Sequence, residues 1–139
     1  MNFVARLRER LGREEGFTLI ELLVVIVIIG ILLAIAVPSY LGFKDRANNR
    51  AAQADIRAAL PSAEAYYADQ SPNSYSGIDA TALKAIDSGL AAAVVAVATG
   101  GGAGYCIGAD VGGKQWSVEG PGATAWHQST DCSGAAVTP

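Results

Sequence analysis

The feature that most constrains this chain of 139 residues is a long apolar run near its start. Residues 22–43 contain no charged side chain, and the centre of the run reads LLVVIVIIGILLAIAV. About 20 consecutive apolar residues are enough for a helix to span the hydrocarbon core of a bilayer. The run therefore argues against a wholly water-soluble protein with a single core, and it predicts one membrane-spanning helix.

Charge is distributed unevenly on the two sides of this run. Beyond residue 53, eight acidic side chains face only three basic ones, and the whole chain carries a net charge of -3. This acidic balance argues against a dedicated nucleic-acid binder. A cluster of basic residues before a membrane helix favours retention of that end in the cytoplasm, so the acidic part is expected outside. The basic residues before the run are Arg6, Arg8, Arg10 and Arg13.

Glu21 is a single carboxylate at the start of the apolar segment, four residues after Phe17. A charge in this environment is costly unless it is paired, protonated or at the membrane surface. Cleavage between Gly16 and Phe17 would give Phe17 a free α-amine, which could neutralise Glu21 within one chain or between two packed helices. In the second case the pair would also fix the helix register. Alternatively, Glu21 reaches interfacial water and has no further role. The residues alone leave both interpretations open.

The segment GFTLIELLVVIVIIGILLAIAVPSYLGFKDRA resembles the N-terminus of type IV pilins and of type II secretion pseudopilins. The matching residues are Gly16 at the cleavage point, Phe17 as the new N-terminus, Glu21 as its fifth residue and Pro38 within the apolar helix. The resemblance implies a leader of residues 1–16, removed by a prepilin peptidase that also methylates the Phe17 amine. It further implies helical assembly in which Glu21 meets the Phe17 amine of a neighbouring subunit.

On this resemblance we expect a structural, non-enzymatic subunit of a type IV pilus. The precursor is expected as a single-pass protein of the inner membrane with its head outside. An assembly platform in that membrane would then build it into an extracellular homo-oligomeric filament. A pseudopilin of a type II secretion or DNA-uptake system is the alternative within the family. A monomeric single-span protein whose head binds a ligand or partner is an alternative of another class. We expect no cofactor and no nucleic-acid partner.

The fold class expected is α+β, the pilin fold, with one long helix packed on a small antiparallel sheet. The helix is predicted from Phe17 to about Ala68. Its apolar assembly part with its extension occupies 17–52, and the globular head occupies 53–139. A stripe at helical spacing is predicted to face the sheet, and it consists of Ala52, Ile56, Leu60, Ala63 and Tyr67. Weak points or bends are expected where glycine or proline interrupts the helix, at Gly30, Pro38, Gly42 and Pro61.

The head after this helix is predicted to contain a loop region over 69–90 and a sheet over 91–128. Within the loop region, Asp79 is expected to cap a short helix, Ala80–Ile86. Glycines between apolar segments indicate hairpin joints, with Gly112-Gly113 as a two-residue turn. The expected strands are 91–98, 104–111, 114–120 and an edge strand near 125–128.

The cysteines Cys106 and Cys132 can form one disulfide, with 25 residues between them. Disulfides persist outside the cytoplasm, where the head is expected. Two free buried thiols are the alternative. The resemblance likewise implies a C-terminal region, 106–132, closed by a disulfide.

Two sequence patterns suggest enzymatic or nucleotide chemistry but have simpler explanations. GADVGGKQ, residues 108–115, nearly matches a phosphate-binding loop, yet Gln115 replaces the required hydroxyl and a strand-like segment follows. A β-hairpin explains its glycines. His127, Ser129 and Asp131 alternate along one segment, whereas a hydrolytic triad requires an oriented base and an oxyanion hole. His127 is therefore expected to be a surface or packing residue.

Metal binding has little support in the sequence. Calcium requires six to eight oxygen ligands in a compact arrangement, and the acidic residues that could supply them are scattered. Calcium binding by the head stays open, but no metal site is assigned. The residues considered are Asp110, Glu119 and Asp131. Trp116 and Trp126 are expected in the core or on a strand face, with exposure for adhesion as the alternative.

Overall fold

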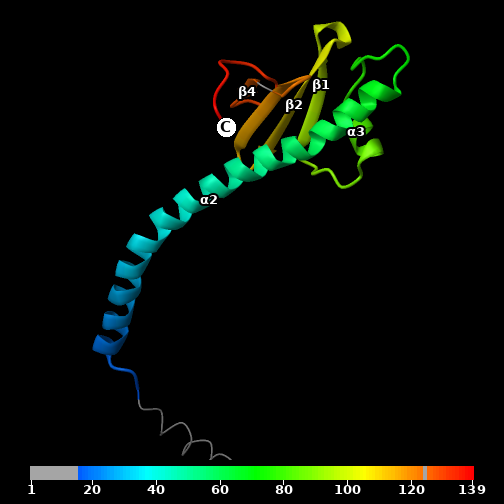
Figure 1. Ribbon diagram of the computed structural model, residues 1–139. Helices are drawn as coiled ribbons and strands as arrows, with labels where there is room; N and C mark the ends of the chain where they lie inside the picture. Colours follow the sequence, from blue (N-terminus) through cyan, green and yellow to red (C-terminus); the bar gives the residue numbers. More distant parts are fainter. Residues whose placement is uncertain (1–15, 124) are drawn as a thin grey trace, which may run out of the picture. The chain divides into compact units, whose positions relative to one another are not determined.

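The computed structural model describes residues 16–139 except Thr124; most of the predicted leader therefore lies outside the described residues. The elements are α2 (Leu19–Asp69), α3 (Ala80–Ile86), β1 (Val94–Thr99), the 3-10 turn η1 (Gly100–Gly102), β2 (Gly104–Val111), β3 (Lys114–Gly120) and β4 (Ala125–His127) (Figure 1). The chain divides into two compact units, which we call the first unit, ending at Leu41, and the second unit, Gly42–Pro139. Each is described by itself.

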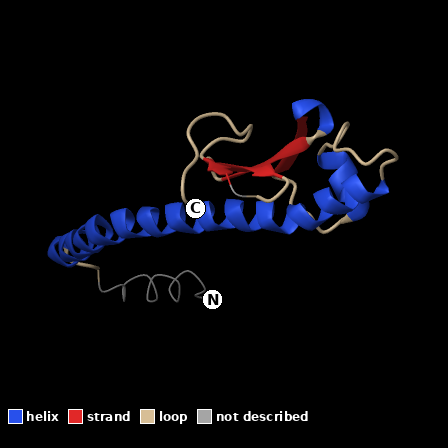
Figure 2. Ribbon diagram, turned by 45° about the horizontal axis from the view of Figure 1, so that its top comes forward, coloured by secondary structure: helices blue, strands red, loops and turns tan. Residues whose placement is uncertain are grey.

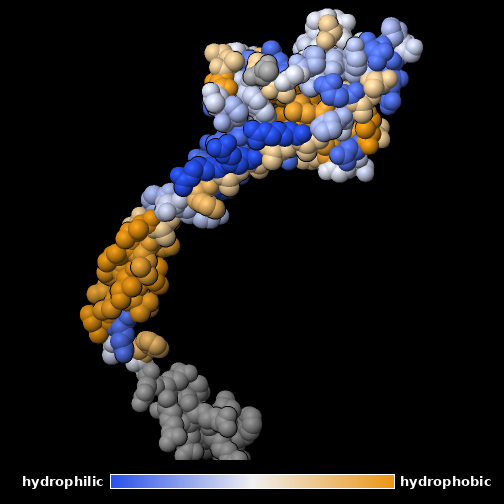
Figure 3. All heavy atoms as spheres, viewed as in Figure 1, coloured by the Kyte–Doolittle hydropathy of each residue, from blue (hydrophilic) through white to orange (hydrophobic). Residues whose placement is uncertain are grey.

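The first unit consists of the apolar part of α2. Every residue from Leu19 to Leu41 is exposed, and the most apolar stretch of the helix has a mean hydropathy of 3.3. The space-filling view shows this part as apolar over its visible surface, apart from a hydrophilic patch at its start (Figure 3). By length and composition this helix can cross a membrane. A helix that is apolar on every side belongs in lipid or among other helices, because water does not solvate it favourably.

Both prolines of α2, Pro38 and Pro61, lie inside a continuous helix, and neither ends it. Proline lacks the backbone N–H, so each removes the hydrogen bond to the carbonyl four residues earlier. At Pro61 the following residues, Ser62 and Ala63, are buried. Their packing against the sheet holds the helix together across the missing bond.

The second unit contains a four-stranded antiparallel sheet in the order β1-β2-β3-β4. The predicted turn Gly112-Gly113 joins β2 to β3, and both glycines have positive φ, 59° and 80°. Such a two-residue turn matches the twist of the flanking strands. β1 begins at Val94 and not at residue 91, because the amide of Val94 donates to the carbonyl of Ala91 and closes a turn there (3.2 Å).

The core of the second unit lies between the second part of α2 and one face of the sheet (Figure 2). The fully buried helix positions are Ala52, Ile56, Ala59 and Ala63. Small alanines allow the helix to approach the strands closely. The predicted stripe is thus correct at three positions, whereas Leu60 and Tyr67 are only partly buried. Packing centred on Ala59 displaces these two larger side chains towards the edge. From the strands the core takes Tyr105, Ile107, Ala109, Trp116 and Val118.

The loop region between α2 and β1 is held by polar contacts of specific side chains. Asp79 caps α3 as predicted, because its Oδ1 accepts from the amide of Ala82 (2.7 Å). The hydroxyls of Tyr75 and Tyr105 both donate to the carboxylate of Glu64, at 2.9 and 3.0 Å. A residue on α2 therefore ties both the loop and β2 to the helix.

Candidate functional site

The predicted cleavage point lies immediately before α2. Gly16 and Phe17 are non-helical and exposed, and Phe17 is 87% exposed. A Cβ at Gly16 would meet no atom within 4 Å. Exposed, irregular chain is where proteases cut most readily. The bond between Gly16 and Phe17 is thus accessible in this structure.

Glu21 forms a capping box with Thr18 at the start of α2. Its Oε2 accepts from the amide of Thr18 (2.8 Å) and from the Thr18 hydroxyl (2.6 Å), while the Glu21 amide donates to that hydroxyl (3.3 Å). This reciprocal arrangement satisfies backbone donors that the first helical turn leaves unpaired. Sequence reasoning missed it, although T-x-x-E directly before an apolar run is its known signature.

The capping box leaves half of the Glu21 carboxylate available. Both contacts from Thr18 go to Oε2, and no hydrogen bond within the described residues reaches Oε1. Glu21 is part of the lining of a shallow apolar hollow with a volume of about 360 Å³. The other lining residues are Phe17, Ile20, Val24 and Val25. One end of the helix thus presents, within an apolar face, a carboxylate oxygen that accepts no hydrogen bond from the described residues.

Pro38 lies apart from this site. It is 17 residues beyond Glu21, which is about 25 Å along an α-helix. It is exposed, like its neighbours in α2. The structure therefore brings Phe17 and Glu21 together at one end of the helix and leaves Pro38 as a separate feature.

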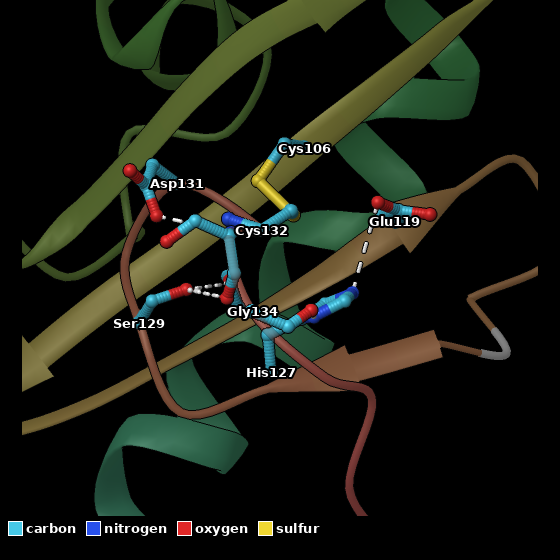
Figure 4. Close-up of a disulfide and its surroundings, with 9 residues drawn as sticks. Cys106, Glu119, His127, Ser129, Asp131, Cys132 and Gly134 are labelled. Carbon is cyan, nitrogen blue, oxygen red and sulfur yellow. Dashed lines mark hydrogen bonds and ion pairs between the residues drawn. A yellow bond between two sulfur atoms is a disulfide. The ribbon is translucent and has the colours of Figure 1, made fainter.

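The disulfide between Cys106 and Cys132 is present, as predicted. It joins β2 to the C-terminal segment, which covers the face of the sheet opposite α2 (Figure 4). The buried hydroxyl of Ser117 accepts from the amide of Cys132 (3.0 Å). Gly108 lies so close under Thr130 that a Cβ there would overlap the Thr130 carbonyl oxygen. Cys106 and Ser117 are therefore buried beneath this segment.

His127 is a buried packing residue. Its Nδ1 lies 3.2 Å from the carbonyl oxygen of Gly134, and its Nε2 lies 3.7 Å from Oε1 of Glu119. Ser129 instead donates to the carbonyl of Ser133 (3.1 Å), and Asp131 accepts from the amide of Ser133 (3.1 Å). His127 thus contacts Gly134 and Glu119, whereas Ser129 and Asp131 share Ser133 as a partner, so the three side chains do not form a hydrolytic triad (Figure 4).

The acidic residues considered for calcium have different partners. Asp110 accepts from the amide of Gly113 and from the side chain of Gln115 within the hairpin. Glu119 faces His127, and hydrogen bonds from Ser133 lower the pKa of Asp131. Within the described residues, no group of three or more metal-ligating side chains occurs. The segment 108–115 is a β-hairpin and has no helix start that could hold phosphate.

Comparison with known proteins identifies relatives of the N-terminal region. Residues 11–37 match the model of the prokaryotic N-terminal methylation motif. The type II secretion system core protein G of Aeromonas hydrophila is 40% identical over 74 residues, 52% of each chain. A type IV narrow pilus major component of Thermus thermophilus is 52% identical over 56 residues, 40% of this chain and 45% of that protein. A type IV major pilin of Myxococcus xanthus is 38% identical over 58 residues, 42% of this chain and 26% of that protein.

These findings confirm the resemblance drawn from the N-terminal residues. The chain carries the N-terminal methylation motif, and its relatives are both type II secretion pseudopilins and type IV pilins. The fold is the expected α+β arrangement of long helix, small antiparallel sheet and C-terminal disulfide. The chain spans about half the length of the type II secretion relatives it matches. No solved structure matches the chain significantly.

Proposed function

We propose that this chain is a structural subunit of a type IV pilus. Its leader, residues 1–16, is removed after Gly16, and the new N-terminus at Phe17 is methylated. The precursor crosses the inner membrane once through the apolar part of α2, and an assembly platform transfers it into a filament outside the cell. Its role is structural and not catalytic.

The observation that carries this proposal is the first unit itself. Exposed apolar side chains cover α2 from Leu19 to Leu41, and an apolar surface of this extent requires lipid or other protein around it. A Cβ at Gly30 would meet nothing within 4 Å, so packing inside the chain does not explain a glycine that weakens the helix. Small residues let neighbouring helices approach closely in lipid and in bundles.

Glu21 provides the specific contact in this mechanism. After cleavage, the Phe17 amine of a neighbouring subunit would meet the free Oε1, while Oε2 keeps its contacts with Thr18. Lipid is as apolar as the helix, so hydrophobicity alone does not favour helix pairing over lipid contact. A buried charge pair between two helices would favour their pairing over lipid contact, and it would also set their register.

A pseudopilin of a type II secretion system is the second candidate. The similarity to type II secretion core protein G extends over 74 residues, further than the 56 and 58 residues shared with the two pilus proteins. The identity is higher with the pilus component of Thermus thermophilus, at 52% against 40%. The disulfide-closed C-terminal region also favours a subunit exposed on a pilus.

The intact mass of the protein, sheared from cells and compared with the membrane fraction, tests this proposal. A sheared species that begins at Phe17, one methyl group heavier and two hydrogens lighter, supports cleavage, methylation, the disulfide and export together. The same mature mass found only in membranes supports the pseudopilin. An unmodified chain that still begins at Met1, in cells with an active prepilin peptidase, would contradict both.

A further inference from the structure

Within the second unit, basic side chains are concentrated near its start in the sequence and acidic side chains follow them. Residues 44–57 contain four basic and two acidic side chains, whereas residues 58–139 contain seven acidic and two basic ones. A band of strongly hydrophilic side chains follows this stretch of the helix (Figure 3). Arg46, Arg50 and Arg57 are all exposed and, at spacings of four and seven residues, lie on one side of the helix. We call these three residues the basic stripe.

Two of the three arginines of the basic stripe are held in place by other side chains of the second unit. Arg50 donates to the buried Gln53 (3.0 Å), and the guanidinium of Arg57 stacks over the ring of Trp126, 5.1 Å from its centre. No ion pair within the described residues joins Arg46, Arg50 or Arg57 to a carboxylate, while nearby Asp45 pairs with Lys114. Side chains that are already ordered lose less entropy when they bind a partner.

A shallow groove of about 290 Å³ lies beside Arg46 and Arg50 of the stripe. Its walls include Arg46, Arg50, Gln53, Trp116 and Gln128. Guanidinium groups bind carboxylates and phosphates with paired hydrogen bonds. The groove therefore fits an anionic group.

The chain itself carries exposed carboxylates at the far end of the same unit. Asp69, Asp79 and Asp87 are exposed in the segment 69–87, which we call the acidic segment. Asp69 lies 23 residues beyond Arg46, about 35 Å along α2. The basic stripe and the acidic segment of one copy are therefore too far apart along the helix to meet. A second, parallel copy that is displaced by about 35 Å along the helix axis brings its acidic segment level with the stripe of the first.

We propose that the basic stripe binds the acidic segment of a second copy of this chain. The contact is heterologous, so it repeats from copy to copy and extends without closing. It rests on the proposed filament function. Because its displacement of about 35 Å exceeds the distance of about 6 Å between residues 17 and 21 along the helix, it involves a different neighbour in the filament from the contact at Glu21. Anionic lipid explains the stripe less well. Arg57 lies 14 residues beyond the last residue of the apolar run, about 21 Å along the helix, whereas a headgroup layer is only about 5–8 Å thick.

Charge reversal in the full-length chain, expressed in its own host, tests the interface. Arg46→Glu/Arg50→Glu and Asp69→Arg/Asp87→Arg are each expected to lower the yield of sheared filaments about tenfold or more, because like charges placed together strongly oppose association. The two reversals combined are expected to restore at least half of the yield. Asp131→Arg, in the C-terminal segment outside both surfaces, is the matched control and should leave the yield unchanged. Mature protein in the membrane should stay constant in every variant.

A cysteine pair gives a second readout. Arg50→Cys combined with Asp69→Cys is expected to produce disulfide-linked ladders in sheared filaments and none in the membrane fraction. Normal filaments from either reversal alone, or failure of the combination to restore them, would overturn the interface while leaving the proposed function intact. Loss of the stripe variant from the membrane without rescue would assign the stripe to anionic lipid. A wild-type chain that is never processed or assembled would overturn the proposed function and this interface with it.

Discussion

The two parts of α2 share one continuous helix but differ in what surrounds them. From Leu19 to Leu41 every residue is exposed, whereas the part in the second unit buries one side against the sheet. Packing of a buried face supplies most helix stability in globular proteins. The second part obtains this stabilisation within the chain, and the first part must obtain it from lipid or from other copies. Substitutions in the two parts should therefore affect different measurements.

The largest expected effect concerns assembly and the first part. Glu21→Val should lower the yield of sheared filaments about tenfold or more, because removing one member of a buried charge pair weakens association strongly. Membrane insertion and unfolding of the second unit should not change. Glu21→Gln separates the two roles of this residue, because glutamine can still form the capping box but cannot neutralise an amine. Normal filament yield with Glu21→Val would count heavily against the proposed mechanism.

A matched pair of isoleucines compares the two parts directly. Ile56 is fully buried and Ile28 is 51% exposed. Ile56→Ala should lower the free energy of unfolding of the second unit by about 2–5 kcal/mol, because it leaves a cavity in the core. Ile28→Ala should change it by less than about 0.5 kcal/mol. Denaturant unfolding of the full chain in detergent, followed by tryptophan fluorescence, measures the free energy of unfolding of both variants. Equal losses in the two variants would contradict the proposed difference between the two parts of α2.

The disulfide should stabilise only the second unit. Replacing Cys106 and Cys132 by serine frees a long loop in the unfolded chain and should cost about 3 kcal/mol. The same unfolding experiment measures the loss. Insertion of the apolar helix into membranes, assayed by carbonate extraction, is the control and should not respond. Unchanged unfolding would mean that Ser117 and Thr130 alone hold the C-terminal segment.

The smallest effect is a pH dependence at the far end of α2. Burial, and then the hydrogen bond to the Glu64 carboxylate, raise the pKa of Tyr75 from about 10 to about 12. The same causes raise the pKa of Tyr105. The folded state therefore holds these protons more tightly, so stability is complete below pH 10 and falls as the pH rises towards 12. Unfolding measured across this range should show the loss.

Tyr75→Phe provides the control for this pH dependence. It should lower stability at neutral pH by about 1 kcal/mol, since one hydrogen bond is lost, and it should weaken the decline above pH 10. A wild-type protein with constant stability up to pH 12 would contradict the assigned contact.

Much of the fold follows from local sequence patterns. The span of α2, the capped helix at Asp79 and the turn at Gly112-Gly113 were predictable, because hydrophobic period, caps and turn glycines act over a few residues. The start of β1 and the centre of the buried stripe were not. The start of β1 depends on the turn that the Val94 amide and the Ala91 carbonyl close. The centre of the stripe depends on which helix positions pack against the sheet, and hydrophobic spacing alone did not identify Ala59.

The candidate site likewise contains some features that the sequence predicted and other contacts that only the structure revealed. Gly16, Phe17, Glu21 and Pro38 were identified by their spacing, and their roles in cleavage and assembly remain predictions. The contacts of Thr18 with the amide and the carboxylate of Glu21 were missed, although the T-x-x-E spacing is the signature of a capping box. The ties from Glu64 to Tyr75 and Tyr105 span 11 and 41 residues of sequence, so only tertiary structure brings these groups together.

The sequence by itself determined an apolar membrane-type helix with one carboxylate at its start, because composition and spacing along a helix are properties of the chain alone. Only the tertiary structure decided that the Glu64 carboxylate meets the hydroxyls of Tyr75 and Tyr105. It likewise decided that Arg57 is held over Trp126, and no ion pair within the described residues joins this arginine to a carboxylate. Pairing between distant residues depends on their separation in space, and that separation is set by packing against the sheet.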